Sequence, residues 1–398
     1  MITNILFGVL SILVVIFIGW VFCENKRAIR WRVVGTGLLI DFLLLIFFVK
    51  VPIGVDFLNW LTDGFIKIVS FGNVGIEFIF GKQLMSSSFG VFFVSSLMPV
   101  VYMCSLIYVL YKLKVIPFMI RILNATIGRF MGISGFDATA TIGNTILGGS
   151  EAPSFVHPYL DKATKSEIFT LITVGFSSTA LSILPAYAGL GIPMKFLIII
   201  NILSVFTGLI MAKLIVPETE KIDRNTKIAP MQEDTLMGAV SSGANVGFNI
   251  AVKISALIIG VLGLLALVNW ILGFAHLSLP MIFGWIMLPI TKMLHMPLQY
   301  QHMASNLVAT KIYSNEFVAF INLGHFIKAL PQKVALEIVC LLLNFGNISV
   351  VGITVAYMKG FTNNKRVNDI TTKTVWKSLL AGILSSILLT AIIAVVFA

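Results

Sequence analysis

The sequence predicts an all-helical integral membrane protein with about eight transmembrane helices and two re-entrant helical hairpins. Hydrophobic residues make up 58% of the 398 residues and charged residues only 11%, against roughly 25% charged residues in soluble domains. The apolar residues form blocks near the roughly 20 helical residues that cross a bilayer core of about 30 Å. Blocks such as residues 5–21 and 379–397 are apolar on every face, which excludes the alternating strands of a membrane β-barrel.

Basic residues account for the net charge of +11, and they flank the apolar blocks. They form no stripe beside stacking aromatic residues, so nucleic-acid binding is not indicated. By the positive-inside rule these flanks face the cytoplasm, which predicts a multi-pass protein of the cell inner (plasma) membrane with both termini outside. Residues 1–23 lack the features of a cleaved signal peptide and are predicted to stay as a membrane helix. The basic flanks are Lys26, Arg27, Arg30, Arg32, Lys112, Lys114, Arg121, Arg129, Lys359, Lys365, Arg366, Lys373 and Lys377.

Eight apolar spans follow one another along the chain. Between the second and third, residues 51–84 scatter charged side chains among apolar ones at helical spacing, which predicts an interfacial helix on the outer surface. Residues 217–234 mix both charge signs and are predicted to be a cytoplasmic connector. The spans are residues 5–22, 33–50, 90–111, 167–190, 195–216, 245–273, 333–358 and 378–397.

Two further stretches, residues 132–161 and 281–333, are apolar in part but broken by Gly, Pro, Asn and acidic residues. Irregular backbone at membrane depth is tolerated only inside protein or beside a water-filled cavity, so both are predicted to be re-entrant hairpins. Each is followed by a span with small or polar residues at its middle. Such a duplication indicates inverted repeats around a transporter binding site near the bilayer midplane. The charge pattern predicts that the first hairpin enters from inside and the second from outside.

Four segments make up the predicted organisation of the chain. Residues 1–131 hold the N-terminal membrane helices, the interfacial helix and a scaffold helix. Residues 132–216 hold the first hairpin and two helices of a transport domain. Residues 217–280 hold the cytoplasmic connector and a further scaffold helix, and residues 281–398 hold the second hairpin and the last two helices.

One acid stands in each predicted hairpin: Glu151 in Gly-Gly-Ser-Glu-Ala-Pro and Glu316 in Asn-Glu-Phe-Val-Ala. A carboxylate at the bilayer centre costs about 2.5 to 3.5 kcal/mol on insertion scales, so it must face a cavity, a cation or a hydrogen-bonding ligand. Their matched positions predict one shared site. The alternative is that each acid is hydrated at an interface.

The seventh span carries Asn344 and Asn347 where it is predicted to unwind. Their amides can donate to and accept from a sugar hydroxyl or a base edge, and an interhelical hydrogen bond is the alternative, favoured for Asn344. Phe345, between them, has two interpretations: stacking on a ring or packing.

Three functional classes fit a polyhelical membrane protein: a carrier, a passive pore and an enzyme. The five histidines form no metal-ligand pair at helical spacing, and no nucleophile has a partner base, so an enzyme is not indicated. A pore would show a filter motif or a ring of like charge, and neither is visible in the sequence. The paired interrupted spans and the two intramembrane acids therefore favour a carrier of a small polar solute, with no cofactor.

Four segments resemble motifs of the concentrative nucleoside transporter family. They occur in the family's order and, with the preceding helices, cover nearly the whole chain. The segments are Asn144-Thr-Ile-Leu-Gly-Gly-Ser-Glu-Ala-Pro153 followed by His157-Pro-Tyr-Leu160, Gly243-Ala-Asn-Val-Gly-Phe-Asn-Ile-Ala-Val-Lys-Ile-Ser-Ala-Leu257, Asn315-Glu-Phe-Val-Ala319, and Asn344-Phe-Gly-Asn-Ile-Ser-Val-Val-Gly-Ile353.

The resemblance implies a homotrimer in the bilayer that takes up nucleosides by cation-coupled symport, with a transport domain moving elevator-fashion past a fixed scaffold. It implies that Gly149, Ser150 and Glu151 face the nucleobase while Ile183 and Phe345 pack against it. Glu316 and Asn347 would hold the ribose hydroxyls. A coupling sodium ion would lie at Asn144, Ser178 and backbone carbonyls of Leu147 and Thr179. A proton is the alternative coupling ion, and another small polar solute is the alternative cargo.

Two positions depart from the family pattern. Gly149 stands where many members have a glutamine for the base, which removes a donor and an acceptor, enlarges the base pocket and predicts a shift toward purine nucleosides. Val350 stands where members have a second serine for the ribose. Ser349 compensates only if the helix is rotated locally.

Overall fold

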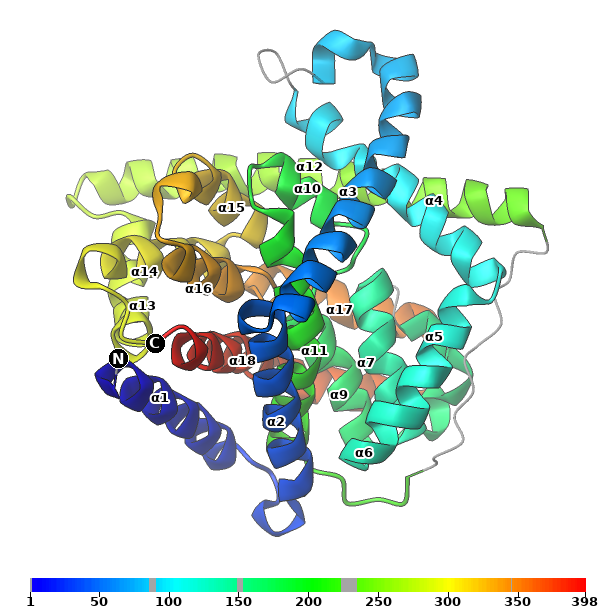
Figure 1. Cartoon of the computed structure of the whole chain (residues 1–398), viewed down its shortest axis with the longest axis vertical. Helices are drawn as coiled ribbons and strands as arrows, with labels where there is room; N and C mark the ends of the chain where they lie inside the picture. The colour runs from blue at the N-terminus through cyan, green and yellow to red at the C-terminus, as the bar shows by residue number, and fades with distance from the viewer. Residues whose placement is uncertain (1, 86–90, 149–152, 223–234, 345) are drawn as a thin grey trace.

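The computed structural model describes residues 2–85, 91–148, 153–222, 235–344 and 346–398. Within these ranges all regular secondary structure is helical, as predicted (Figure 1). The elements are α1 (Ile2–Val21), η1 (Lys26–Ala28), α2 (Trp31–Lys50), α3 (Pro52–Phe80), η2 (Lys82–Met85), η3 (Phe93–Leu97), α4 (Pro99–Lys112), α5 (Val115–Leu123), η4 (Asn124–Gly128), α6 (Arg129–Met131), α7 (Gly135–Leu147), α8 (Pro153–Val156), η5 (His157–Lys162), α9 (Lys165–Ser177), α10 (Leu184–Gly189), α11 (Met194–Ile215), α12 (Leu236–Gly273), α13 (Leu279–Met293), α14 (Leu298–Tyr313), α15 (Glu316–Gly324), η6 (Ile327–Ala329), α16 (Gln332–Leu342), α17 (Ile348–Phe361) and α18 (Lys365–Val396).

Continuous and broken helices together make the predicted spans. In the described part of the chain, five helical stretches are each long and apolar enough to cross a membrane: α2, η3 with α4, α11, α12 and α18. The fourth span is broken into α9 and α10, and the seventh into α16 and α17. With α1 and these two broken spans, the predicted set of crossings is complete. The predicted interfacial stretch forms one helix, α3, which projects from the body in Figure 1.

Helices α4 and α12 cross at very short distance because α12 presents a stripe of small residues. Ala239, Gly243, Gly247 and Ala251 recur every fourth residue, and all are buried. A Cβ atom at Gly243 would lie 2.6 Å from the Cα of Ser105, so backbone meets backbone at this crossing. Small residues at this spacing are the means by which membrane helices approach closely. The helix begins at Leu236, earlier than the predicted residue 245, because Thr235 caps it there, its side chain accepting from the backbone of Gly238 at 3.0 Å.

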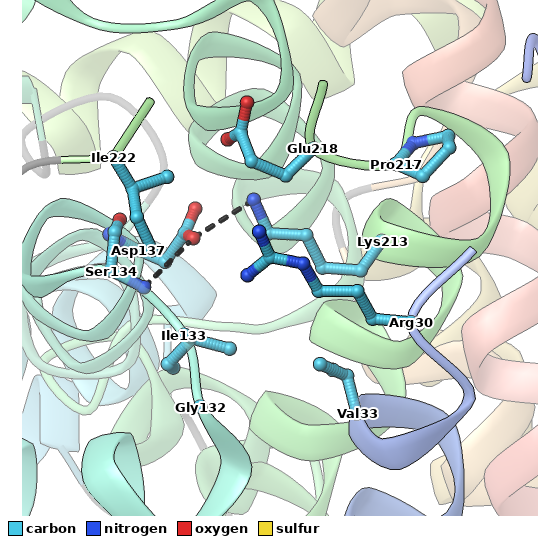
Figure 2. Close-up of a pocket in the computed structure, with 10 residues that line it drawn as sticks. All are labelled: Arg30, Val33, Gly132, Ile133, Ser134, Asp137, Lys213, Pro217, Glu218 and Ile222. Atoms are coloured by element: carbon cyan, nitrogen blue, oxygen red, sulfur yellow. Dashed lines mark hydrogen bonds and ion pairs between the residues drawn. The ribbon is translucent and has the colours of Figure 1, made fainter. Parts of the chain in front are cut away.

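The first hairpin begins at α7 and is tied down by a buried ion pair. The side chain of Ser134 caps α7 and accepts from the backbone of Asp137 at 3.0 Å. Lys213 on α11 lies 2.8 Å from the carboxylate of Asp137 (Figure 2). It also donates to Ser166 on α9 at 2.9 Å. One ammonium group therefore joins the starts of α7 and α9 to the end of α11.

The second interrupted stretch contains a separate helix in addition to the predicted hairpin. Residues 279–293 form a separate helix, α13, and the hairpin consists of α14 and α15. The boundary is set by His295, whose φ of 52° is left-handed, and by Pro297, the N-cap residue of α14. Pro289, one of the residues that suggested a broken hairpin, instead lies inside α13, whereas Pro297 marks the start of α14.

The two hairpins and the spans after them form matching repeats. Helix α7 with α8 precedes the broken pair α9 and α10 and then α11; α14 with α15 precedes α16 and α17 and then α18. The breaks meet, because a Cβ at Gly346 would lie 3.5 Å from the carbonyl oxygen of Phe176. The chain ends lie together (Figure 1), and a Cβ at Gly8 on α1 would approach the side chain of Val395 on α18 to 2.5 Å.

Candidate substrate and ion site

Glu316 lies at the turn between the two helices of the second hairpin. It is the first residue of α15, and the side chain of Asn315 caps that helix by accepting from the backbone of Val318 at 3.0 Å. The Glu316 side chain is buried at 3% exposure. The polar pair Asn-Glu thus interrupts an apolar stretch because it starts a new helix, and the same local structure directs a carboxylate into the protein interior.

Asn347 brings the seventh span to this carboxylate. Helix α16 ends at Leu342 and α17 begins at Ile348. Asn347 caps α17, its Oδ1 accepting from the backbone of Val350 at 3.2 Å, and its Nδ2 donates to Glu316 at 2.9 Å. The structure therefore joins two of the residues predicted for the ribose.

Tyr187 on α10 completes the contacts of the carboxylate, and the sequence reasoning missed it. Its hydroxyl donates to Glu316 at 3.2 Å. Its ring lies 4.7 Å from that of Phe317 and 4.8 Å from that of Phe320, measured between centroids, and it is fully buried. A tyrosine one turn after the predicted residue Ile183 was the available signal, because a buried hydroxyl requires a partner.

Two helix ends favour a negative charge at Glu316. Glu316 is itself the first residue of α15, and the cap Asn347 brings the N-terminus of α17 to its carboxylate, where the positive end of a helix dipole favours an anion. Lys311 on α14, in the same hairpin, is also buried at 2% exposure. Its place in an apolar stretch, five residues before Glu316, is a signal that sequence reasoning also missed.

A second group of oxygens lies where the first hairpin meets the broken fourth span. The side-chain nitrogen of Asn144 on α7 donates to the carbonyl oxygens of Ala140 at 3.0 Å and Leu171 at 3.2 Å. Its Oδ1 is buried and, within the described residues, accepts no hydrogen bond. The hydroxyl of Thr179, a residue predicted to offer its backbone carbonyl, is likewise buried without a partner there and is a further candidate oxygen. Ser178 donates to Val174 at 2.8 Å, which leaves its oxygen lone pairs available.

The ends of α7 and α9 favour a cation at these oxygens. Helix α7 ends before Gly148, whose φ of 93° turns the chain, and α9 ends at Ser177. The segments are joined by Leu181, whose backbone donates to Thr145 at 3.0 Å. Two helix C-termini present the negative ends of their dipoles here, which favours a positive ion.

Asn201 on α11 supports this segment and was not predicted. Its Oδ1 accepts from the backbone of Thr179 at 3.4 Å, and the residue is buried at 1% exposure. An asparagine alone in an apolar span was its only signal. Among the described residues no group of three His, Cys, Asp or Glu side chains is placed to hold a metal.

The oxygens at Asn144, Ser178 and Thr179 belong to an amide and two hydroxyl groups. They are therefore neutral oxygen ligands, which suit a small hard cation.

Some predicted residues lie outside the described part of the chain. Ile183 is buried in the break between α9 and α10, and the backbone of Leu147 and Ser349 lies in α7 and α17. The side chains of Leu147 and Ser349 are not described, and the following predicted residues fall outside the described residues altogether: Gly149, Ser150, Glu151 and Phe345.

Known proteins are similar to this sequence over nearly its whole length. Residues 196–394 match the model of the Na+ dependent nucleoside transporter C-terminus, and residues 10–83 match that of the N-terminus. The nucleoside permease NupC of Helicobacter pylori is 31% identical over 405 residues, covering 97% of this chain and 96% of that protein. The chain belongs to the Na+ dependent nucleoside transporter family. Its family makes it a nucleoside transporter and not an enzyme.

Further members of this nucleoside transporter family agree in sequence and in fold. The uncharacterised transporter YutK of Bacillus subtilis is 32% identical, covering 98% of both chains. The structure of CNTnw in an inward-facing substrate-bound state superposes with a TM-score of 0.93 at 27% identity, covering 99% of both chains. Structures of CNTnw variants in outward-facing and intermediate states match with TM-scores of 0.93. The predicted transporter fold is thereby confirmed.

Proposed function

We propose that this transporter takes up nucleosides into the cell by sodium-coupled symport and that Glu316 is the centre of its ribose site. The observation that carries the proposal is the buried carboxylate of Glu316, contacted by Asn347 at 2.9 Å and Tyr187 at 3.2 Å where a hairpin and two broken spans meet. Buried polar groups at such breaks mark transporter binding sites.

Neighbouring hydroxyls of a ribose suit this arrangement chemically. An ionised carboxylate offers two acceptor oxygens and can accept from two hydroxyls, while an asparagine amide both donates and accepts. Asn347 then moves part of its hydrogen bonding from Glu316 to the ligand. A buried carboxylate that lacked such partners would be strongly unfavourable in the membrane.

Sodium is favoured over a proton because the candidate ion site consists of neutral oxygens. Asn144 Oδ1 and the Thr179 hydroxyl are buried and unpaired within the described residues, and the ends of α7 and α9 add the negative ends of two helix dipoles. Neutral donors of this kind would take up an ion directly and would gain little from a proton. The Na+ dependence in the description of the matching family supports the same choice.

For the nucleobase, we propose that Gly149 widens the pocket toward purines, with Ser150, Glu151, Ile183 and Phe345 as its other contacts. The reason lies in the sequence: Gly149 stands where many family members have a glutamine, whose side chain offers both a hydrogen-bond donor and an acceptor. Competition by inosine against uridine uptake measures the preference. Inosine is expected to compete better than uridine itself; equal or weaker competition contradicts the purine proposal.

For the movement, we propose an elevator in a homotrimer, with both chain ends on the outer side of the inner membrane. The close crossing at Gly243 packs α4 against α12 backbone to backbone, which suits a fixed scaffold, and CNTnw has been solved in inward-facing, intermediate and outward-facing states. Much of the surface of α12 is apolar and exposed, including Phe248, Ile259 and Trp270, which suits contact with lipid and with other subunits. Light scattering in detergent tests for the trimer.

Uptake of radiolabelled uridine and inosine into proteoliposomes tests the coupling. A sodium gradient, a proton gradient and no gradient are imposed in turn on the same preparation. Accumulation above the external concentration under the sodium gradient alone is the expected result. Accumulation driven only by protons would transfer the coupling role to a buried acid, and equilibration without accumulation would indicate a passive pathway. Absence of uptake by folded, oriented protein would contradict the nucleoside assignment itself.

A further inference from the structure

Lys311 has contacts that no part of the proposed transport scheme uses. Its side chain lies inside the protein at the end of α14, at 2% exposure. Nζ donates to the carbonyl oxygen of Leu341 at 2.9 Å and to Oδ1 of Asn344. Both partners belong to the seventh span, so this one ammonium group links the second hairpin to the point where that span unwinds.

The Leu341 carbonyl group lies in the last turn of α16, where the helix breaks. Helix α16 ends at Leu342, and the last carbonyl groups of a helix lack the amide that would follow one turn later. Inside a membrane protein such a group must find another donor. Lys311 supplies that donor.

Asn344 connects Lys311 to the unwound segment. Its Oδ1 accepts from Lys311 and also from the backbone of Gly346 at 3.0 Å. The next residue is Asn347, which caps α17 and donates to Glu316. The order of contacts is therefore lysine, Asn344, the backbone of Gly346, Asn347 and the carboxylate.

The geometry points to Lys311 as a positioning residue that holds the unwound segment of the seventh span against Glu316 and thereby sets selectivity for the ribose hydroxyls. This inference rests on the proposed ribose site and adds to it the residue that fixes its shape. Lys311 itself is not expected to touch the ligand, since its contacts are with Leu341 and Asn344.

Equilibrium binding of uridine and of 2′,3′-dideoxyuridine to the purified full-length protein tests the inference. In Lys311→Met, uridine affinity is expected to fall about tenfold or more, the size of effect that follows the loss of a charged hydrogen-bond donor, and dideoxyuridine affinity by less than about threefold. The control is Lys328→Met, which removes an exposed charge from the turn after the same hairpin. It should leave both affinities unchanged.

A second variant separates positioning from simple loss of folding. Asn344→Ala keeps the lysine and should also lower uridine affinity more than dideoxyuridine affinity. Adding Lys311→Met to it should lower uridine affinity less than Lys311→Met does alone, because the two residues act in one chain of contacts. If Lys311→Met does not fold, Asn344→Ala decides the matter by the same selectivity.

Equal losses for the two ligands, or unchanged binding in folded Lys311→Met, would overturn the inference while leaving the proposed function in place. Wild-type protein that binds neither nucleoside would instead overturn the proposed function and the inference with it. Wild-type protein that binds both equally would show that the ribose hydroxyls are not read at this site, which contradicts both the Glu316 assignment and the role of Lys311.

Discussion

The side-chain amide of Asn347 donates a 2.9 Å hydrogen bond to the carboxylate of Glu316, which is 31 residues away in the sequence. Each residue stands at the N-terminal end of its helix, so the contact joins the positive ends of α15 and α17. Through this contact the hairpin and the broken seventh span of the second repeat form one polar site. Tyr187, in the first repeat, also contacts the carboxylate of this site.

Tyr187→Phe is expected to weaken nucleoside binding without abolishing it. The substitution removes one hydroxyl that donates to Glu316 at 3.2 Å and leaves the ring contacts with Phe317 and Phe320 in place. Loss of one hydrogen bond to a charged group predicts a KM for uridine raised about tenfold. Uptake kinetics in proteoliposomes measure it. A KM equal to wild type would show that the hydroxyl does not contribute to the site.

Thr179→Val should raise the sodium concentration needed for half-maximal uptake while leaving uptake at saturating sodium largely intact. The change keeps the shape of the side chain and removes a buried hydroxyl that has no partner among the described residues. The loss of one oxygen ligand predicts a shift of about fivefold or more. Thr170→Val is the matched control, since the Thr170 hydroxyl is already bonded within α9. The ion assignment is contradicted if both variants respond to sodium in the same way.

Gly243→Ala is expected to destabilise the protein, whereas Gly260→Ala on the same helix is not. A methyl group at Gly243 would lie 2.6 Å from the backbone of Ser105 on α4, and nothing lies within 4 Å of the equivalent position at Gly260. Alanine is the better helix former by about 1 kcal/mol, so the second variant should be neutral or slightly more stable. Thermal unfolding in detergent compares them. Equal midpoints would show that the α4 and α12 crossing tolerates separation.

Glu24 makes one contribution to stability that depends on pH. It lies in the loop after α1 and pairs with Lys165 and with Lys377, the latter at 2.9 Å. Partial burial opposes its ionisation, but the two ammonium groups outweigh that effect and hold the pKa of Glu24 below its ordinary value. Because the folded pKa lies below the unfolded value of about 4.3, the stabilisation is present above that pH and is lost as the pH falls through the folded pKa.

Glu24→Gln should therefore lower the unfolding midpoint at pH 7 and have no effect at a pH well below 4. The expected shift is small because both lysines are partly exposed and water screens the pairs. Thermal scans of both proteins at the two pH values measure it. A difference that persists unchanged in acid would assign the effect of Glu24 to packing.

Sequence reasoning predicted the parts of the fold that depend on composition and on local pattern. The apolar blocks predicted the positions of the spans. The paired asparagines of the seventh span predicted its break, because a helix cap is specified by residues next to the helix end. Asn347 and Glu316 were predicted to share a site, and the structure joins them. The resemblance to a known family supplied the roles of individual residues.

Other features depend on contacts between distant segments and could not be predicted. The partners of Tyr187 and Lys311 lie 129 and 33 residues away, and nothing local to either side chain specifies them. The separate helix α13 was missed because its prolines suggest a broken hairpin, whereas Pro280 lies in its first turn and Pro289 is accommodated inside it. The stripe of small residues on α12 indicates a close crossing, but its partner α4 follows only from the folded structure.

The most direct test of the central claim is uridine uptake by the Glu316→Gln variant. Glutamine keeps the size of the side chain and removes its charge. Its NH2 group is a donor, so it cannot accept from both Tyr187 and Asn347, which each donate to the carboxylate. Because the substitution weakens two charge-assisted hydrogen bonds, uptake should fall about 100-fold or more, to background, while the protein remains assembled in its normal oligomer. Glu77→Gln, at an exposed position on α3, is the control. Uptake at the wild-type level by Glu316→Gln would remove Glu316 from the site and contradict this account.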